Sequence, residues 1–201
     1  MGCLDTIISM NMVIRDAVPQ DAAALAALAE AAMRATYAPI AQAAVYEAMI
    51  AQTCTRDAFE AVLTRGAADE RAALLVAMKD GTLDGYLDFG SDQNGFLELR
   101  RLYTAAARTG RGVGAALVEA LERRLPVGTV YRAVVHARNE RGLAFWIRHG
   151  FVVEGQVDAQ AHFTEHRGLD FDFAQPAERE TSLMIRRTVA STAQNALLGP
   201  A

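Results

Sequence analysis

Three glycines fall within five residues of the sequence: Gly110, Gly112 and Gly114, in the stretch RTGRGVGAALVEALERRLP from Arg108 to Pro126. Apolar residues follow them at four-residue spacing, which predicts an amphipathic helix that stops at the proline. The glycines therefore lie at the start of this helix, where backbone N–H groups lack intrahelical partners and the helix dipole is positive. Because a glycine-lined helix start lets an anion approach the backbone, the stretch predicts a phosphate-binding loop.

Two nucleotide-binding motifs compete for this loop, and neither fits well. A P-loop needs Gly-Lys followed by Ser or Thr, which the stretch lacks. Gly110, Gly112 and Ala115 match the dinucleotide pattern G-x-G-x-x-A, but the following VYRAVVHAR offers no acidic residue for the ribose hydroxyls. The strand before such a loop should also be nearly all apolar. Charged residues interrupt the segment FLELRRLYT, so a Rossmann domain is the weaker alternative.

The segment before the loop, Phe96 to Thr104, alternates apolar and polar residues and predicts a β-strand. Side chains alternate between the two faces of a strand, so the odd-numbered Leu97 and Leu99 should share one face, whereas the even-numbered Leu102 should lie on the other. The apolar face therefore changes phase at the two arginines, as an inserted residue would cause. We predict a β-bulge there, a feature that often lies beside active sites. The alternative is that Arg101 simply lies at a sheet edge.

Three segments resemble the GNAT (GCN5-related) N-acetyltransferases. The stretch LELRRLYTAAARTGRGVGAALVEAL resembles the fourth strand and pyrophosphate loop of that family, and NERGLAFWIRHGF resembles its second cofactor motif. Near the start, VIRDAVPQDAAALAAL resembles its first strand and helix, so the match spans about Val13 to Arg186. The resemblance implies an α/β (α+β) fold. Its central sheet would be mixed but largely antiparallel, with about six to seven strands flanked by helices and a splay at a bulge in strand 4.

Length and composition predict one domain, because 201 residues with 52% hydrophobic side chains can bury one core. We expect an N-terminal extension at 1–11, the acetyltransferase domain at 12–187 and a flexible tail at 188–201. Further helices are expected over about 40–65, broken near Cys54, and over 139–150. A hairpin is expected at Lys79-Asp80-Gly81, and 151–157 and 180–187 should form the last two strands.

Cysteine usage predicts a cytoplasmic protein, and the alanine-rich composition is typical of a bacterial one. The net charge of −4 argues against a nucleic-acid partner. Cys3 and Cys54 form no paired motif and are expected to be free thiols. No apolar run reaches membrane-spanning length. The opening MGCLDT matches a myristoylation pattern, but no polybasic segment supports an anchor, so no membrane partner is expected.

The resemblance implies acetyl-CoA as the cofactor and an amine as the acceptor, and a homodimer stays open. Backbone N–H groups along the loop would hold the pyrophosphate, with Arg108 or Arg111 meeting phosphate charge. Residues at the end of the strand would run beside the pantetheine chain, and Asn139 would reach it. The implied cofactor-binding set is Leu102, Tyr103, Thr104, Thr109, Gly110, Arg111, Gly112, Val113, Gly114, Ala115, Asn139, Phe145 and Trp146.

The chemistry needs a neutral amine, whose conjugate acid has a pKa of about 10, so a base helps at neutral pH. Glu98 is the candidate, directly or through water, because it lies on the central strand beside the predicted bulge, where similar enzymes often carry a carboxylate. The alternative is an ion pair with Arg100 or Arg101. A strand N–H freed by the splay, near Leu102 or Tyr103, would donate to the carbonyl oxygen.

The chain departs from the family pattern at two positions. Thr109 stands where the family usually has Gln or Arg, which backbone binding tolerates. Trp146 stands where the family usually has a tyrosine that protonates the departing sulfur, and an indole N–H is not a usable acid. Tyr103 and Tyr131 are the alternative acids, and each can equally be a packing residue. A thiolate with a pKa of about 8.5 can also leave unaided, at a slower rate.

A polar segment near the C-terminus carries His162, Glu165 and His166, whose spacing could suggest a metal site. Without a third clear ligand, solvated surface is the better interpretation, and no metal is expected. Its carboxylates would favour a cationic amine if they line a rim: Asp158, Asp170, Asp172, Glu178 and Glu180. Within the family, the segments LELRRLY, AHF and SLMIRR together most resemble the bacterial polyamine acetyltransferases. The competing hypothesis is an acyl-CoA sensor of the same fold without turnover, motivated by Trp146.

Overall fold

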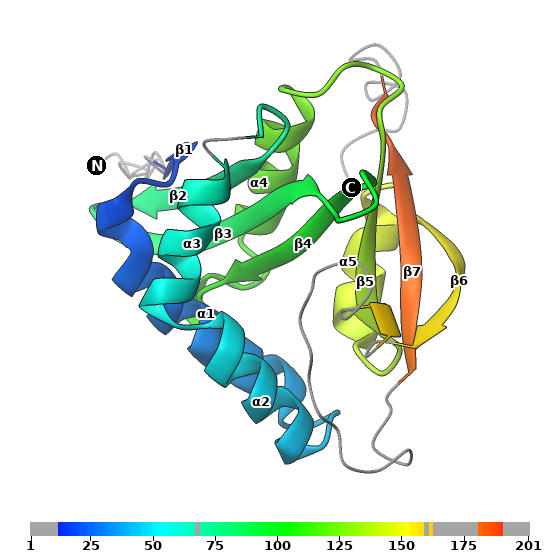
Figure 1. Ribbon diagram of the computed structural model, residues 1–201, viewed down its shortest axis with the longest axis horizontal. Helices are drawn as coiled ribbons and strands as arrows, with labels where there is room; N and C mark the ends of the chain where they lie inside the picture. Colours follow the sequence, from blue (N-terminus) through cyan, green and yellow to red (C-terminus); the bar gives the residue numbers. More distant parts are fainter. Residues whose placement is uncertain (1–11, 67–68, 159–160, 163–180, 191–201) are drawn as a thin grey trace, which may run out of the picture.

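The computed structural model describes residues 12–66, 69–158, 161–162 and 181–190. Within them a single seven-stranded sheet has the order β1-β2-β3-β4-β5-β7-β6 (Figure 1). The strands are β1 Met12–Asp16, β2 Ala73–Lys79, β3 Thr82–Ser91, β4 Leu97–Thr104, β5 Val130–His136, β6 Val152–Asp158 and β7 Thr181–Thr188. The helices are α1 Ala22–Tyr37, α2 Ala43–Thr53, α3 Arg56–Gly66, α4 Val113–Glu122 and α5 Glu140–Arg148. The predicted N-terminal extension lies outside the described residues, as does most of the predicted tail.

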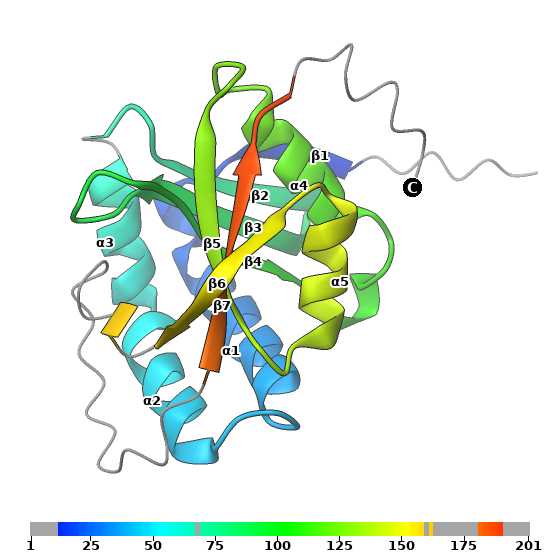
Figure 2. The ribbon, with the colours of Figure 1, turned by 90° about the vertical axis from the view of Figure 1, so that its right-hand side faces the viewer.

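Two hydrophobic clusters cover the two faces of the sheet. Side chains of α1, α2 and α3 pack with Leu74, Val76 and Tyr86 on one face. Side chains of α4 and α5 pack with Leu75 and Leu87 on the other. Because β2 and β3 alternate between the clusters, both faces of these central strands are buried. Figure 2 shows α4 and α5 together on their side of the sheet, with β5, β7 and β6 crossing in front.

Every strand pair is antiparallel except β4 and β5, which run parallel and form one bridge, between Glu98 and Arg132. Beyond this bridge the two strands diverge toward their C-terminal ends (Figure 1). The splay predicted for strand 4 is therefore confirmed. The backbones of β4 and β5 thus separate in a V in the middle of the sheet, and we refer to this separation of the two backbones as the opening between β4 and β5.

The bulge in β4 is also confirmed. Asp88 of β3 pairs with Arg101, whereas the next residue, Phe89, pairs with Leu99, so Arg100 is the extra residue. The register shift with β3 decides for the bulge over the alternative, in which Arg101 simply lies at a sheet edge. The extra residue explains the phase change: Leu99 and Leu102 both reach the α4 side of the sheet.

Turn chemistry fixes several element boundaries as expected. Asp80 and Gly81 take positive φ values of 50° and 78°, which closes the β2–β3 hairpin. The helical stretch after residue 40 is broken at Cys54, between α2 and α3. One boundary differs, because α4 ends at Glu122, before the predicted stop at Pro126. Leu125 closes a turn with the Glu122 carbonyl instead of extending the helix.

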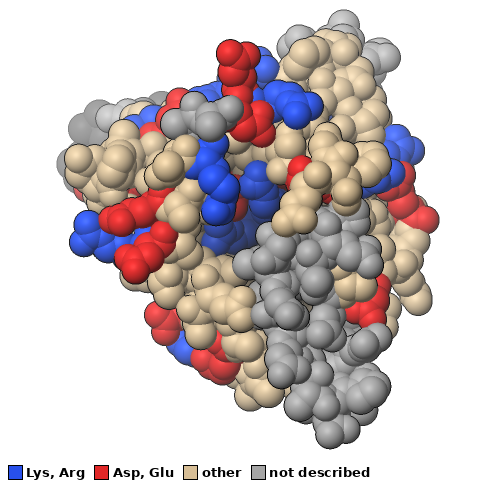
Figure 3. All heavy atoms as spheres, viewed as in Figure 1, with Lys and Arg blue, Asp and Glu red and all other residues tan. Residues whose placement is uncertain are grey.

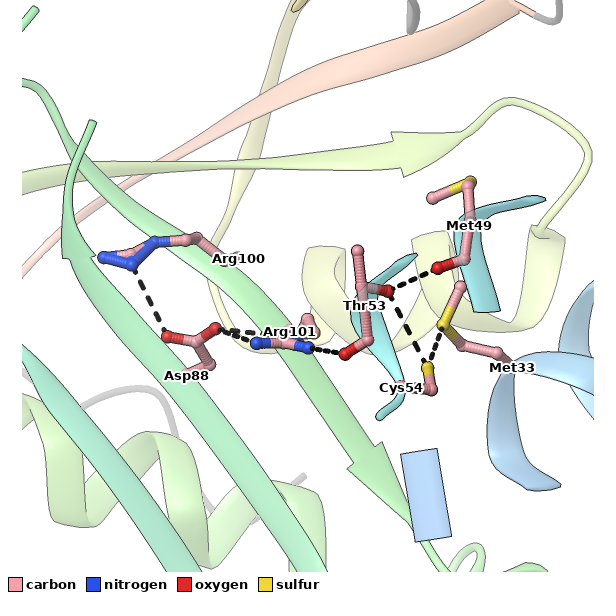
Figure 4. Close-up of polar contacts among 7 residues, drawn as sticks. All are labelled: Met33, Met49, Thr53, Cys54, Asp88, Arg100 and Arg101. Atoms are coloured by element: carbon pink, nitrogen blue, oxygen red, sulfur yellow. Dashed lines mark hydrogen bonds and ion pairs between the residues drawn. The ribbon is translucent and has the colours of Figure 1, made fainter. Parts of the chain in front are cut away.

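A buried ion pair between β3 and β4 also connects the sheet to α2, through a hydrogen bond to Thr53 (Figure 4). The Arg101 guanidinium donates to Asp88 Oδ2 at 2.8 and 3.0 Å and to the Thr53 carbonyl oxygen at 2.9 Å. Arg100 also approaches Asp88, at 3.5 Å. Burial lowers the pKa of Arg101, but the charge of Asp88, the neighbouring Tyr86 and the hydrogen bond to Asp88 together raise it above its usual value, so the guanidinium stays charged. Cys54 follows Thr53 and packs its buried thiol against the Met33 sulfur at 3.2 Å.

Replacing Arg101 with Leu should destabilise the protein by about 3 kcal/mol, because it removes the nearest ion-pair partner of the buried Asp88 carboxylate. The Thr53 carbonyl would also lose its donor. Chemical denaturation measures the change in the free energy of unfolding. Arg56→Leu, which breaks only an exposed pair with Glu60, is the matched control and should have no measurable effect. Equal stability of the two variants would contradict the structural role of Arg101.

Candidate functional site

The glycine loop between β4 and α4 opens to solvent. Gly110 and Gly112 have φ values of 76° and 80°, and Gly112 is the N-cap of α4. A Cβ atom built on either glycine would meet nothing within 4 Å, so their backbone is accessible to a ligand. Val113, the first residue of α4, is buried in the core and anchors the helix start. Thr109 and Ala115 are partly buried at the two sides of the loop. This is the geometry required of an anion site at a helix N-terminus.

Gly114 has a different role from its neighbours. A Cβ atom there would lie 3.3 Å from the Phe145 ring and 3.7 Å from Leu102 Cδ2. The missing side chain therefore allows α4 to approach α5 and β4 closely. A side chain at Gly114 would therefore point into the protein and not into the space in front of the loop. The contact of its backbone with the cofactor stays a prediction.

The two arginines of the loop are not equivalent. Arg108 forms an ion pair with the buried Asp84, with 2.9 Å between Nε and Oδ2. Arg111 is exposed and forms no ion pair with any other described residue. Arg111 is therefore the better candidate for phosphate charge.

The second predicted cofactor motif forms α5. The Asn139 side chain caps this helix, accepting a hydrogen bond from the Gly142 N–H at 2.9 Å. Trp146 is 8% exposed and makes edge contacts with the rings of Phe145 and Phe151. Its indole is thus part of the core on the α4 side of the sheet, and Phe145, which is less buried, lies between it and Gly114.

Glu98 lies at the point where β4 and β5 begin to diverge. Its neighbours on β4, Leu97 and Leu99, pack into the α4-side core, so the Glu98 side chain points to the opposite face. The carboxylate is 3% exposed and bonds to His162, with 3.0 Å between Oε1 and Nε2. The predicted alternative, an ion pair with Arg100 or Arg101, is wrong, because both arginines are directed at Asp88.

His162 also corrects the prediction of a solvated surface, since its side chain is 6% exposed. No spacing pattern links it to a residue 64 positions earlier, so sequence reasoning missed this partner. Glu165 and His166 lie outside the described residues, as do the predicted acidic residues from Asp170 onward. Asp158 is described, and its carboxylate accepts from the Ala161 N–H. Within the described part of the chain, no group of three potential ligands could hold a metal ion.

The two candidate acids have different surroundings. Tyr131 immediately precedes Arg132, the bridge residue of β5, but its ring is fully buried in the α4-side core and its hydroxyl donates to Glu122 Oε1 at 2.9 Å, so it is a packing residue. Tyr103 lies on β4 beyond the bulge and near the phenols of Tyr86 and Tyr37. Burial and then the neighbouring Tyr37 raise the pKa of Tyr103 well above its usual value, so it keeps its proton at neutral pH. Tyr37, which sequence reasoning missed, also contacts the His136 ring.

A hollow of about 700 Å³ opens on the α3 side of the sheet, and basic side chains are visible in it (Figure 3). Arg100 and Asp88 line it together with Arg65 of α3. Glu98 does not line it, so the hollow and the Glu98–His162 pair are separate features. None of the described helices has the length and hydropathy that a bilayer crossing requires.

Solved structures of other acetyltransferases share this fold. One is PaiA N-acetyltransferase from Thermoplasma acidophilum in complex with coenzyme A, with a TM-score of 0.66 and 22% identity over 89% of this chain and 99% of that chain. Another is ribosomal-protein-alanine N-acetyltransferase from Brucella melitensis, with a TM-score of 0.62 and 22% identity over 88% of this chain and 99% of that chain. A third is an N-acetyltransferase from Staphylococcus aureus Mu50, with a TM-score of 0.63 and 19% identity over 89% of this chain and 99% of that chain.

At these identities the likeness establishes the fold. No curated protein sequence matches the chain closely enough to count as a relative. Residues 25–151, well over half of the chain, match the model of a single family, and they include the glycine loop, the bulged strand and α5. The chain belongs to the acetyltransferase (GNAT) family.

Proposed function

We propose that this protein is an N-acetyltransferase that moves the acetyl group of acetyl-CoA to a primary amine by direct attack in a ternary complex. The observation that carries the proposal is Glu98, a buried carboxylate at the divergence of β4 and β5, on the strand that leads into an open glycine loop. The acceptor would approach from the face that carries α1 to α3, because the Glu98 side chain points there.

The residues present fit acetyl-CoA. The exposed backbone of Gly110, Arg111 and Gly112, at the positive end of α4, suits the pyrophosphate, and the Arg111 guanidinium adds charge. Leu102, Tyr103 and Thr104 border the opening between β4 and β5 on the β4 side, where a pantetheine chain would lie. When bound, acetyl-CoA supplies an activated acetyl group as a thioester.

In this proposal each protein group has one task in proton transfer or charge stabilisation. Glu98 takes a proton from the attacking amine. A backbone N–H of Leu102 or Tyr103, beyond the last bridge to β5, donates to the carbonyl oxygen. Of the two candidate proton donors for the departing thiolate, Tyr103 is the better placed, because it lies on β4 beyond the bridge to β5, whereas the Tyr131 hydroxyl donates to Glu122. The raised pKa of Tyr103 makes its phenol a weaker acid than usual, so this proton transfer would be slow. Trp146 packs in the core and takes no part in proton transfer.

We further propose that residues 12–187 form the catalytic domain and that the enzyme works in the cytoplasm, where acetyl-CoA is made and Cys54 would stay reduced. One of the structural neighbours is named for its action on the alanine of a ribosomal protein, which is a protein amine. For this chain both a small amine, such as a polyamine, and a protein amine are candidates. A homodimer is compatible with either class.

The competing function is an acyl-CoA sensor without turnover. Trp146 favours it, because this residue stands where the family usually has the tyrosine that protonates the departing sulfur. Release of free thiol from acetyl-CoA, measured with spermidine, a peptide with an N-terminal alanine and a peptide with an internal lysine, separates the two. We expect one of these amines to accelerate release well above hydrolysis. Binding of coenzyme A without amine-dependent release in a broader amine panel would favour the sensor.

A further inference from the structure

We infer that His162 is a positioning residue for proton transfer, which holds the Glu98 carboxylate in the orientation that takes the proton of the attacking amine. This inference rests on the proposed function, in which Glu98 is the base. Its basis is the contact of 3.0 Å between His162 Nε2 and Glu98 Oε1. The two side chains are 6% and 3% exposed, so the contact is shielded from bulk water.

The direction of the hydrogen bond follows from chemistry. An ionised carboxylate can only accept, so Nε2 carries the hydrogen and donates it to Glu98. Hydrogen bonds to an ionised acceptor are shorter and stronger than neutral ones. A glutamate side chain has several rotatable bonds, and this bond restricts the rotation that would turn the carboxylate away from the opening between β4 and β5.

The two ends of the Glu98 side chain are fixed by different parts of the fold. Its backbone is held at the single bridge to Arg132, where the two strands are still joined. Its carboxylate is held by a residue that follows β6, 64 positions later in the chain. Arg100 and Arg101, the charged neighbours on β4, are both directed at Asp88 and do not share this task.

Precise placement matters because a base must lie within hydrogen-bond reach of the proton that it removes. A shift of about 1 Å in a catalytic group can lower the rate by about 100-fold. For kcat, the position of the N–H donor that contacts Glu98 should therefore matter more than the presence of an imidazole ring. A glutamine at position 162 places an amide N–H near the position of Nε2, whereas an asparagine amide is too short to reach it.

The experiment compares His162→Asn and His162→Gln in the wild-type and Glu98→Gln backgrounds, with acetyl-CoA and the most active amine of the panel. In the wild-type background we expect His162→Asn to lower kcat by about 10- to 100-fold and His162→Gln to restore it to within a few-fold. In the Glu98→Gln background neither change should lower kcat further. Affinity for coenzyme A, measured by calorimetry, should stay the same throughout.

Several results would overturn the inference. An unchanged kcat in His162→Asn would do so, and an equal loss in both variants would assign the effect to ring packing. The same loss in both backgrounds would show that His162 acts independently of Glu98. If amines are acetylated but Glu98→Gln is silent, the base assignment fails and this inference with it. If no amine is acetylated, the proposed function itself fails.

Discussion

Glu98→Gln should lower kcat by about 10²- to 10⁴-fold, the usual contribution of a general base. The substitution keeps the size of the side chain and an oxygen that can accept from His162, but it removes the basic group. Binding of coenzyme A should be unaffected, because the glycine loop lies at the other end of β4. Thiol release at saturating acetyl-CoA and amine measures kcat, and calorimetry measures the affinity for coenzyme A.

Glu122→Gln is the matched control for this prediction. Glu122 is also a largely buried glutamate, and its carboxylate accepts hydrogen bonds from Arg187 and Tyr131 beneath α4. Its replacement should lower stability and leave kcat nearly unchanged. If Glu98→Gln and Glu122→Gln reduced kcat to the same extent, the loss would reflect general destabilisation and Glu98 would not be the base.

Gly112→Asp should weaken binding of coenzyme A by about 10²- to 10³-fold. Two like unit charges about 4 Å apart near a protein surface repel by about 4 kcal/mol, and each 1.4 kcal/mol is about tenfold in affinity. The new carboxylate would occupy the open space in front of the α4 N-terminus, where a Cβ atom meets nothing. Gly112 has a left-handed φ of 80°, so the substitution strains the backbone, but aspartate tolerates this conformation better than most side chains and meets open space, so the fold should persist. Calorimetric titration with coenzyme A measures the loss.

Gly128→Asp separates charge repulsion from backbone strain. Gly128 also has a left-handed φ, 88°, and a Cβ atom there would likewise meet nothing within 4 Å. It lies in the connection between α4 and β5, which follows the C-terminal end of α4, whereas the glycine loop precedes its N-terminal end. This variant should bind coenzyme A as the wild type does. Unchanged affinity in Gly112→Asp would place the cofactor elsewhere on the protein.

Local sequence patterns predicted the features of the fold that depend on near neighbours. The parity of Leu99 and Leu102 revealed the bulge at Arg100, because side chains alternate along a strand and one extra residue reverses them. Asp80 and Gly81 revealed the hairpin because of the left-handed turn that joins such strands. Three glycines before a periodic helix revealed the loop, although only two of them face open space.

Partners distant in the sequence could not be predicted in this way. Arg100 and Arg101 both form ion pairs with Asp88 and are not directed at Glu98. This arrangement depends on the register between β3 and β4, and no spacing within β4 predicts it. The approach of His162 to Glu98 depends on the path of the chain after β6. The Arg108–Asp84 pair likewise joins β3 to the glycine loop across the fold. Such contacts arise from packing, which periodicity does not encode.

If coenzyme A binds between β4 and β5, the divergence of these strands would make the stability of the protein depend on the supply of that ligand. Past the Glu98–Arg132 bridge, the facing edges of these two strands do not pair with each other, so a ligand in the opening would join the two halves of the sheet. A ligand that binds only the folded state adds its binding energy to stability, about 2.7 kcal/mol at a concentration about 100 times Kd. When coenzyme A and its thioester are scarce, the sheet would open more often and expose the chain to proteases. The abundance of the enzyme would then follow the supply of its own cosubstrate.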